Sequence, residues 1–231
     1  MRPDTRLVSP GRRAAAILGL LFPLVAFAGS AETDDWPDWV DEQERVRARI
    51  AAVNEGELTF LSAADTPVHH HQNHIAITER SLIDGWVTME QCHLNLDQVP
   101  AAQILFRPTA SRNLQVIRFR NMDEAFPDGS SVQLRGIRAD SEVCLRAESR
   151  ALHALDQGIY ELQNGPFMRR FLDGYYPLHL SMSIVYPASL RLSEHMPEQQ
   201  PGFVVTRGPG TIAVEALFEG RLQTRFRFRG D

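Results

Sequence analysis

The chain has 231 residues, of which 43% are hydrophobic and 23% are charged, and its formal net charge is −5 at pH 7. All 24 basic residues are arginine, which excludes Schiff-base, lysine-general-base and P-loop lysine mechanisms. The mildly acidic balance also argues against general nucleic-acid binding.

The first 28 residues contain the three parts of a secretory signal peptide. A basic start is followed by an uncharged apolar run from Ala14 to Ala28, which ends in Ala26-Phe27-Ala28. This run is shorter than the roughly 20 residues that a membrane-spanning helix needs. We therefore predict cleavage near Ala28 and a periplasmic or secreted mature chain without a membrane span. Its net charge is −8, because cleavage removes four arginines and one aspartate from a chain of charge −5.

Residues 29–56 are predicted to form an acidic segment followed by one helix. Apolar residues from Val40 to Val53 recur near one face of a helix over residues 40–53, and Asn54-Glu55-Gly56 ends it. We expect this helix to pack across or cap the domain that follows.

From residue 57 to residue 231 the hydrophobic pattern changes to a period of two, with regular turn signals. The clearest alternation runs from Leu178 to Tyr186, and the final hairpin joins Ile212–Phe218 to Leu222–Phe228. Strands spaced by roughly 8–15 residues without intervening helices predict an all-β fold, either an antiparallel β-sandwich or a partly open barrel. This region forms one domain or two subdomains. The remaining predicted strands are residues 58–61, 74–79, 85–94, 103–107, 114–119, 131–138, 142–147 and 158–162.

The chain has two cysteines, Cys92 and Cys144. An even number of cysteines in an exported protein predicts a disulfide. Closing a loop of about 52 residues would stabilise the fold by roughly 4 kcal/mol in the chain-entropy model. The alternative is that Cys92, beside His93, is a thiolate metal ligand and that Cys144 is a buried thiol.

A histidine-rich tract, His69–His74, leads into a predicted strand, and His93 lies one hairpin away. If the tract is extended, His69 and His71 point to the same side. Because neutral imidazole is the commonest metal ligand, His69, His71, His74 and His93 are a candidate site for a transition metal, Zn or Cu. Their spacing matches no defined zinc motif. The alternative is a solvated polar loop that enters a strand.

A second candidate site lies in the segment Gly165–Pro177, where Asp173-Gly174 predicts a hairpin turn. Two arginines lie among aromatic residues in this segment. The arginines could bind a carboxylate or phosphate, and a planar or sugar-like ligand could stack on the aromatic rings. The alternative is a hairpin that packs its aromatic residues on the rim of a sandwich and leaves the arginines solvated. The candidate ligand-binding residues are Arg169, Arg170, Tyr175 and Tyr176.

The sequence contains no G-x-S-x-G, S-x-x-K or HExxH motif and no Gly-rich phosphate loop. The leading hypothesis is therefore an exported protein of binding or structural type without catalytic chemistry. A second hypothesis is a periplasmic metal-binding protein or metalloenzyme that uses the His69–His74 tract with His93. A third is an accessory subunit that binds a protein partner in the cell envelope.

Overall fold

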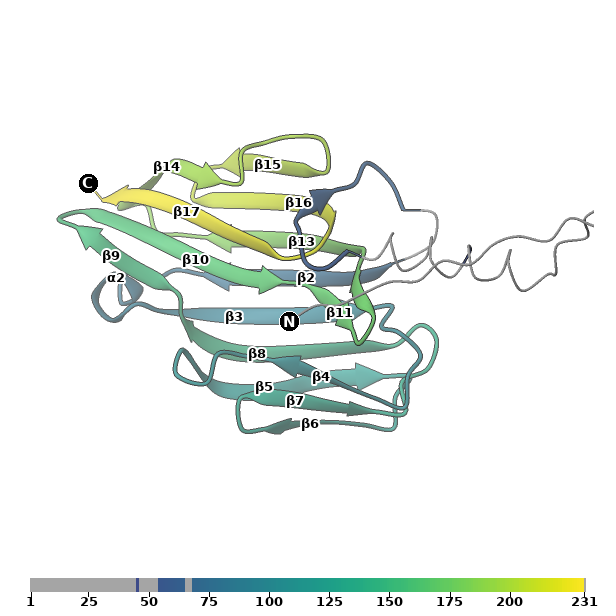
Figure 1. Cartoon of the computed structure of the whole chain (residues 1–231). Coiled ribbons are helices and arrows are strands. Elements are labelled where there is room, and N and C mark those ends of the chain that lie inside the picture. Colours follow the sequence, from purple (N-terminus) through teal and green to yellow (C-terminus); the bar gives the residue numbers. More distant parts are fainter. Residues whose placement is uncertain (1–44, 46–53, 65–67, 231) are drawn as a thin grey trace, which may run out of the picture. The chain divides into compact units, whose positions relative to one another are not determined.

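The computed structural model describes residues 45, 54–64 and 68–230, and most of them lie in β-strands (Figure 1). The chain divides into two units, Met1–Arg45 and Val46–Asp231, and all the described strands belong to the second. The predicted all-β class is confirmed for the described residues. The predicted signal peptide over residues 1–28 and the predicted helix over residues 40–53, apart from Arg45, lie outside them.

In the described part of the Val46–Asp231 unit, one short helix, α2 (Ser81–Asp84), interrupts the strands. Among the described residues, no helix has both the length and the apolar character needed to cross a membrane.

An eight-stranded sheet forms the centre of the unit. Along it lie β1 (Thr59–Phe60), β16 (Thr211–Glu219), β13 (Leu178–Val185), β2 (His69–Ala76), β3 (Trp86–Leu94), β8 (Glu142–Arg150) and β5 (Ser111–Arg120), while β15 (Phe203–Gly208) pairs with β16.

The large sheet is mixed, because β2 and β13 pair in parallel while its other pairs are antiparallel. The prediction of a purely antiparallel arrangement is therefore wrong at this pair. The alternation of apolar residues defines which face a side chain takes, but it carries no information on the direction of a partner strand far away in the chain.

Smaller sheets complete the unit, and none of the sheets in the described part of the chain closes on itself. A four-stranded sheet contains β14 (Leu190–Met196), β17 (Leu222–Gly230), β10 (Ile159–Phe167) and β9 (Leu152–Asp156). A three-stranded sheet contains β4 (Ala101–Leu105), β7 (Ser131–Arg135) and β6 (Glu124–Asp128), and a hairpin is formed by β11 (Arg169–Phe171) and β12 (Gly174–Tyr176).

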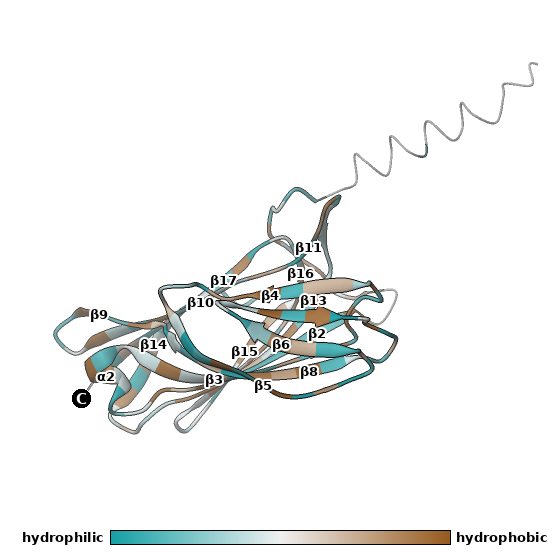
Figure 2. Ribbon diagram, turned by 90° about the horizontal axis from the view of Figure 1, so that it is seen from below, coloured by the Kyte–Doolittle hydropathy of each residue, from teal (hydrophilic) through white to brown (hydrophobic). Residues whose placement is uncertain are grey.

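The four-stranded and three-stranded sheets cover the same face of the large sheet, which we call its inner face (Figure 1). Alternate residues of β8 show this, because Val143 and Leu145 pack with β7 while Ala147 belongs to the cluster that contains Phe226 and Phe228 of β17. Hydrophilic and hydrophobic residues alternate along the strands (Figure 2). The opposite, outer face of the large sheet is therefore mainly polar, with Gln72, Glu90 and Glu215 among its side chains.

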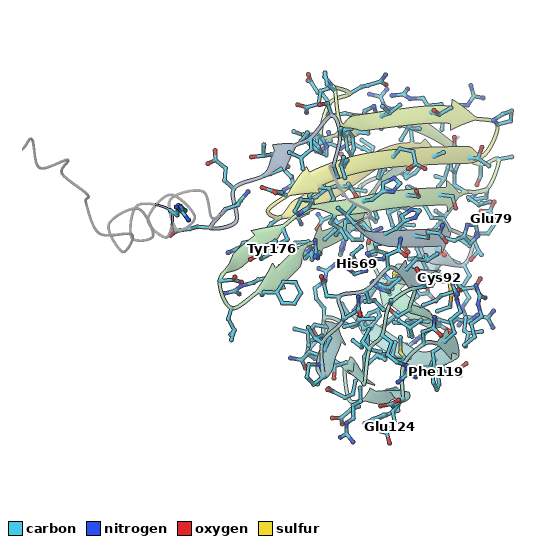
Figure 3. All side chains as sticks on the ribbon, turned by 90° about the vertical axis from the view of Figure 1, so that its right-hand side faces the viewer. His69, Glu79, Cys92, Phe119, Glu124 and Tyr176 are labelled. Atoms are coloured by element: carbon cyan, nitrogen blue, oxygen red, sulfur yellow. A yellow bond between two sulfur atoms is a disulfide. The ribbon has the colours of Figure 1, made fainter. Side chains whose placement is uncertain are left out.

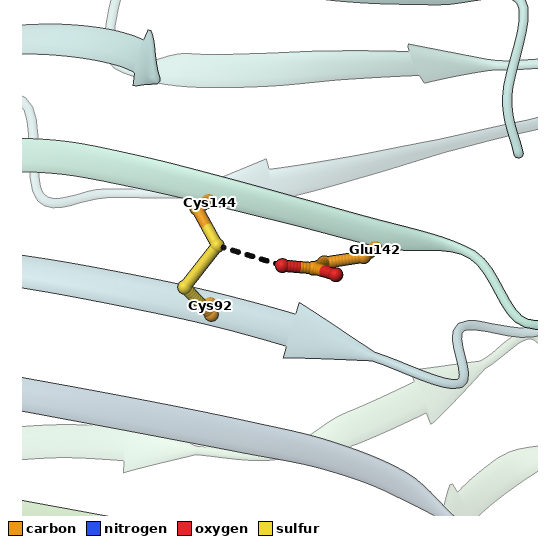
Figure 4. A group of neighbouring side chains, drawn as sticks. All are labelled: Cys92, Glu142 and Cys144. Atoms are coloured by element: carbon orange, nitrogen blue, oxygen red, sulfur yellow. Dashed lines mark hydrogen bonds between the residues drawn. A yellow bond between two sulfur atoms is a disulfide. The ribbon is translucent and has the colours of Figure 1, made fainter. Parts of the chain in front are cut away.

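The predicted disulfide is confirmed, and it links Cys92 of β3 to Cys144 of β8 (Figure 4). The two residues are directly opposite each other in the antiparallel register of these strands. Because both cysteines are oxidised, the alternative that Cys92 is a thiolate ligand is wrong.

Candidate functional site

The histidine side chains of strand β2 lie on both faces of the large sheet. The tract His69–His74 lies within this strand, so the alternative that it is a solvated loop is wrong. His69 and His71 point to the inner face, as the period of two predicts. His74 lies an odd number of residues away from both of them, and its Nδ1 is 2.7 Å from the Oγ of Ser183 on the outer face.

The inner histidine cluster consists of His69, His71 and His93, which the pairing of β2 with β3 brings together. His71 and His93 are register partners, and their ring centroids are 4.3 Å apart. The Nε2 of His69 lies 2.9 Å from the Nδ1 of His93. Three of the four predicted metal ligands are thus neighbours, whereas His74 is on the opposite face and cannot share an ion with them.

Several polar atoms in this region are buried without a hydrogen-bonding partner in the described part of the chain. They are the Nε2 atoms of His71 and His93 and both amide atoms of Asn73. His71 is 7% exposed, His93 5% and Asn73 2%. Burying a polar group without a partner costs free energy. The inner face therefore contains a polar block between the two hydrophobic clusters, with unused hydrogen-bonding and ligand capacity.

Burial keeps the imidazoles of the inner histidine cluster neutral. It lowers the pKa of His69 to about 4, with a further decrease from the charge of Arg169 and an opposing effect of Asp97. Burial, followed by the neighbouring histidines, lowers the pKa of His71 to about 3 and holds that of His93 well below its usual value. The neutral imidazole is the form that binds metal ions.

Three side chains on the outer face also come close enough to share an ion. Among the described residues, Cys92, Glu142 and Cys144 are the only His, Cys, Asp or Glu group with three ligand atoms within 4.8 Å of one another (Figure 4). The Sγ of Cys144 lies 3.4 Å from the Oε1 of Glu142. Because the sulfurs form a disulfide, they are not thiolates and do not provide metal ligands in this state. His69, His71 and His93 do not form such a group either. Their rings would have to rotate before three of their nitrogens lay within 4.8 Å of one another.

The β11–β12 hairpin lies next to His69 (Figure 3). Its Arg169 donates two hydrogen bonds to the carboxylate of Asp97, one of them from Nε to Oδ2 at 2.9 Å. The same guanidinium lies over the ring of Tyr176, 5.4 Å from its centroid. Arg169 therefore already has a carboxylate partner, and it connects the hairpin to the environment of the inner histidine cluster.

The other side chains of the hairpin also contact each other. Tyr175 is buried, and its hydroxyl accepts a hydrogen bond of 2.7 Å from the Nε of Arg221. Arg170 lies over the ring of Tyr175, 5.6 Å from its centroid. These contacts favour the packing alternative for the hairpin, and ligand binding by Arg169, Arg170, Tyr175 and Tyr176 stays a prediction.

Sequence reasoning missed Asp97 and Arg221, which hold the hairpin. Neither residue stands in a motif, and Asp97 is separated from Arg169 by 72 residues. Their role depends on tertiary contacts that no local pattern indicates.

Comparisons with known proteins do not assign a family. No family model matches the chain, and no curated protein matches it. A mutant of a two-domain M1 zinc metallopeptidase bound to L-tryptophan has a TM-score of 0.38 at 11% identity, covering 77% of this chain and 44% of that chain. A mutant M1 zinc metallopeptidase from Deinococcus radiodurans, bound to a Tyr-Ser-Ala substrate, has a TM-score of 0.37 at 9% identity, covering 75% of this chain and 43% of that chain. This chain thus spans less than half the length of these two structures, and the similarity is too low to support a function.

Proposed function

We propose that the protein is an exported binding protein of β-sandwich type that holds one transition-metal ion, Zn or Cu, at the inner histidine cluster. The observation that supports this proposal is that His71 and His93, whose ring centroids are 4.3 Å apart, each bury an Nε2 atom that has no hydrogen-bonding partner among the described residues. A metal ion would satisfy both nitrogens at once. Export is supported by the predicted signal peptide and by the disulfide, which is typical of oxidising compartments.

The contact between His69 and His93 would leave one nitrogen of His93 available to bind a metal ion. When the Nδ1–H of His93 donates to the Nε2 of His69, the Nε2 of His93 keeps its lone pair. Histidines that bind metals commonly donate their other ring N–H in this way, which fixes the tautomer. His71 and His93 would then be direct ligands. His69 would orient His93, or become a ligand itself after a ring rotation.

Neighbouring polar residues extend the possible set of ligands. The Oδ1 of Asn73, two residues from His71 on the same face, is buried and has no partner in the described residues. Imidazole nitrogens suit Zn and Cu, and structural sites usually have four ligands. The amide oxygen or a water molecule would complete the set of ligands, so the ion would need no carboxylate ligand.

The test is elemental analysis of tag-free protein purified from its native compartment and dialysed against a weak chelator. We expect about one metal ion per chain, and loss of this ion in His71→Ala and His93→Ala. His74→Ala is the matched control, because it removes a histidine from the same strand but from the outer face. Substoichiometric metal in the wild type, or full retention in His71→Ala and His93→Ala, would contradict the proposal.

A further inference from the structure

The outer face of the large sheet brings together a second pair of histidines. The parallel register of β2 and β13 places His179 directly beside His70. Their rings stack with centroids 4.1 Å apart and planes inclined by 13°. The Nε2 of His179 also lies 2.9 Å from the Oε2 of Glu215 on β16. Three strands that are distant in the sequence thus bring two imidazoles and one carboxylate together.

Ser181 connects the members of this group. Its hydroxyl donates a hydrogen bond of 2.8 Å to the Oε2 of Glu215. Because the hydroxyl has only one proton, the Nε2 of His70, 2.7 Å from the same Oγ, must donate its N–H to Ser181. In neutral His70 the Nδ1 then carries the lone pair. Ser181 therefore orients both the carboxylate and an imidazole of the group.

We propose that His70, His179 and Glu215 form a second binding site, for a divalent transition-metal ion such as Zn²⁺, with Ser181 as a positioning residue. This site does not depend on the inner histidine cluster, because its side chains lie on the other face of the sheet. Two histidines and one glutamate are an established ligand set for zinc, which leaves further coordination positions open to water.

One observed contact is close to a contact between two ligands of a metal site. Two ligand atoms bound tetrahedrally to one zinc ion lie about 3.3 Å apart, and the Nε2 of His179 and the Oε2 of Glu215 are already 2.9 Å apart. The ion would take the place of the proton between them. Because His70, His179 and Glu215 are not a group with all ligand atoms within 4.8 Å of one another, the His70 side chain must shift to bring its Nδ1 to the ion, while its Nε2–H is still donated to Ser181.

Charge and exposure favour ion exchange with solvent at this site. The carboxylate of Glu215 compensates one of the two charges of the ion, which the neutral inner cluster cannot do. The side chains of His179 and Glu215 are 38% and 60% exposed. The ion would therefore keep water ligands, and we expect it to bind more weakly and to exchange faster than an ion at the inner histidine cluster.

The test is a calorimetric titration of ZnCl₂ into the metal-free full chain and into single variants. We expect two binding events for the wild type and for the control His74→Ala, which lies on the same face of β2. His179→Ala should lose the weaker event, and Glu215→Gln should weaken it at least tenfold and leave the tighter event unchanged. Circular dichroism checks the fold, and His70→Ala is a second deletion variant.

The outcomes separate the two proposed sites. Titration curves of His179→Ala, His70→Ala and Glu215→Gln that equal the wild-type curve overturn the outer site, whatever the inner cluster binds. A single wild-type event that His179→Ala removes supports the outer site and contradicts the inner one. A single event that His179→Ala leaves intact overturns the outer site alone.

Discussion

The two faces of strand β2 place the same type of residue in opposite surroundings. On the inner face, His71 and His93 are buried and their Nε2 atoms have no partner among the described residues. On the outer face, His70 hydrogen-bonds Ser181, which in turn donates to the carboxylate of Glu215. The Nε2 atoms of His71 and His93 depend on a bound ion or an enclosed water for a partner, whereas the outer imidazoles already have partners and reach solvent. Burial, rather than residue type, therefore separates the two proposed sites.

Acid should destabilise the metal-free protein through its inner face. The folded-state pKa values of about 4 for His69 and about 3 for His71 lie below the unfolded value near 6.5. Between these values the unfolded chain binds more protons, so the free energy of unfolding falls as the pH falls from 6.5 towards 4. For His71 alone this loss, from pH 7 to pH 4, is on the order of 3 kcal/mol.

Urea denaturation in a chelating buffer at pH values from 7 to 4 measures this effect. His71→Gln removes the titrating group and should flatten the pH dependence, while His74→Gln on the outer face should leave it unchanged. Equal pH dependence of the free energy of unfolding in the wild type and in His71→Gln would show that burial does not lower the pKa of His71.

The disulfide is the largest single stabilising contact that we assign to the outer face. Replacing both Cys92 and Cys144 with alanine should lower the free energy of unfolding by about 2–4 kcal/mol. Because the sulfurs point away from the inner face, metal retention by the inner histidine cluster should not change. Denaturant titration and elemental analysis of the same sample test both statements, and loss of the ion would show that the two faces are coupled.

The hairpin should influence the inner cluster through its ion pair. Arg169→Met leaves Asp97 without its partner, at a cost of about 1–2 kcal/mol, because both side chains keep some contact with solvent. The charge of Arg169 lowers the pKa of His69 and Asp97 raises it, so removal of the arginine should raise this pKa. Titration of the His69 ring by NMR measures the shift. A pKa that does not move would mean that the hairpin is electrostatically separate from the cluster.

The smallest expected effect is that of Ser181→Ala. This change removes the hydrogen bond that the hydroxyl donates to Glu215 and the one that it accepts from His70, and both side chains keep solvent as an alternative partner. We expect a loss of about 1 kcal/mol in the affinity of the outer site for Zn²⁺, or roughly fivefold. Calorimetry with Ser183→Ala as the control measures it. An unchanged affinity would show that Ser181 does not contribute to Zn²⁺ binding at the outer site.

The inner site could largely be predicted from the sequence, because a period of two already places His69 and His71 on one face. The same rule excludes His74, which is an odd number of residues away from both of them, so His74 could have been excluded from the sequence alone. The outer site could not be predicted. His70 meets His179 only because β2 and β13 pair in parallel, and no local pattern indicates the partner of a strand so far away in the chain.

The disulfide also determines how the chain responds to a cut. Strands β4, β5, β6 and β7 all lie between Cys92 and Cys144 in the sequence, so the three-stranded sheet and one edge of the large sheet form a loop closed by this bond. A protease that nicks a turn within this loop leaves two fragments joined through sulfur. The nicked protein would migrate as one band until a reductant is added. The chain can therefore lose a peptide bond there without losing its covalent continuity.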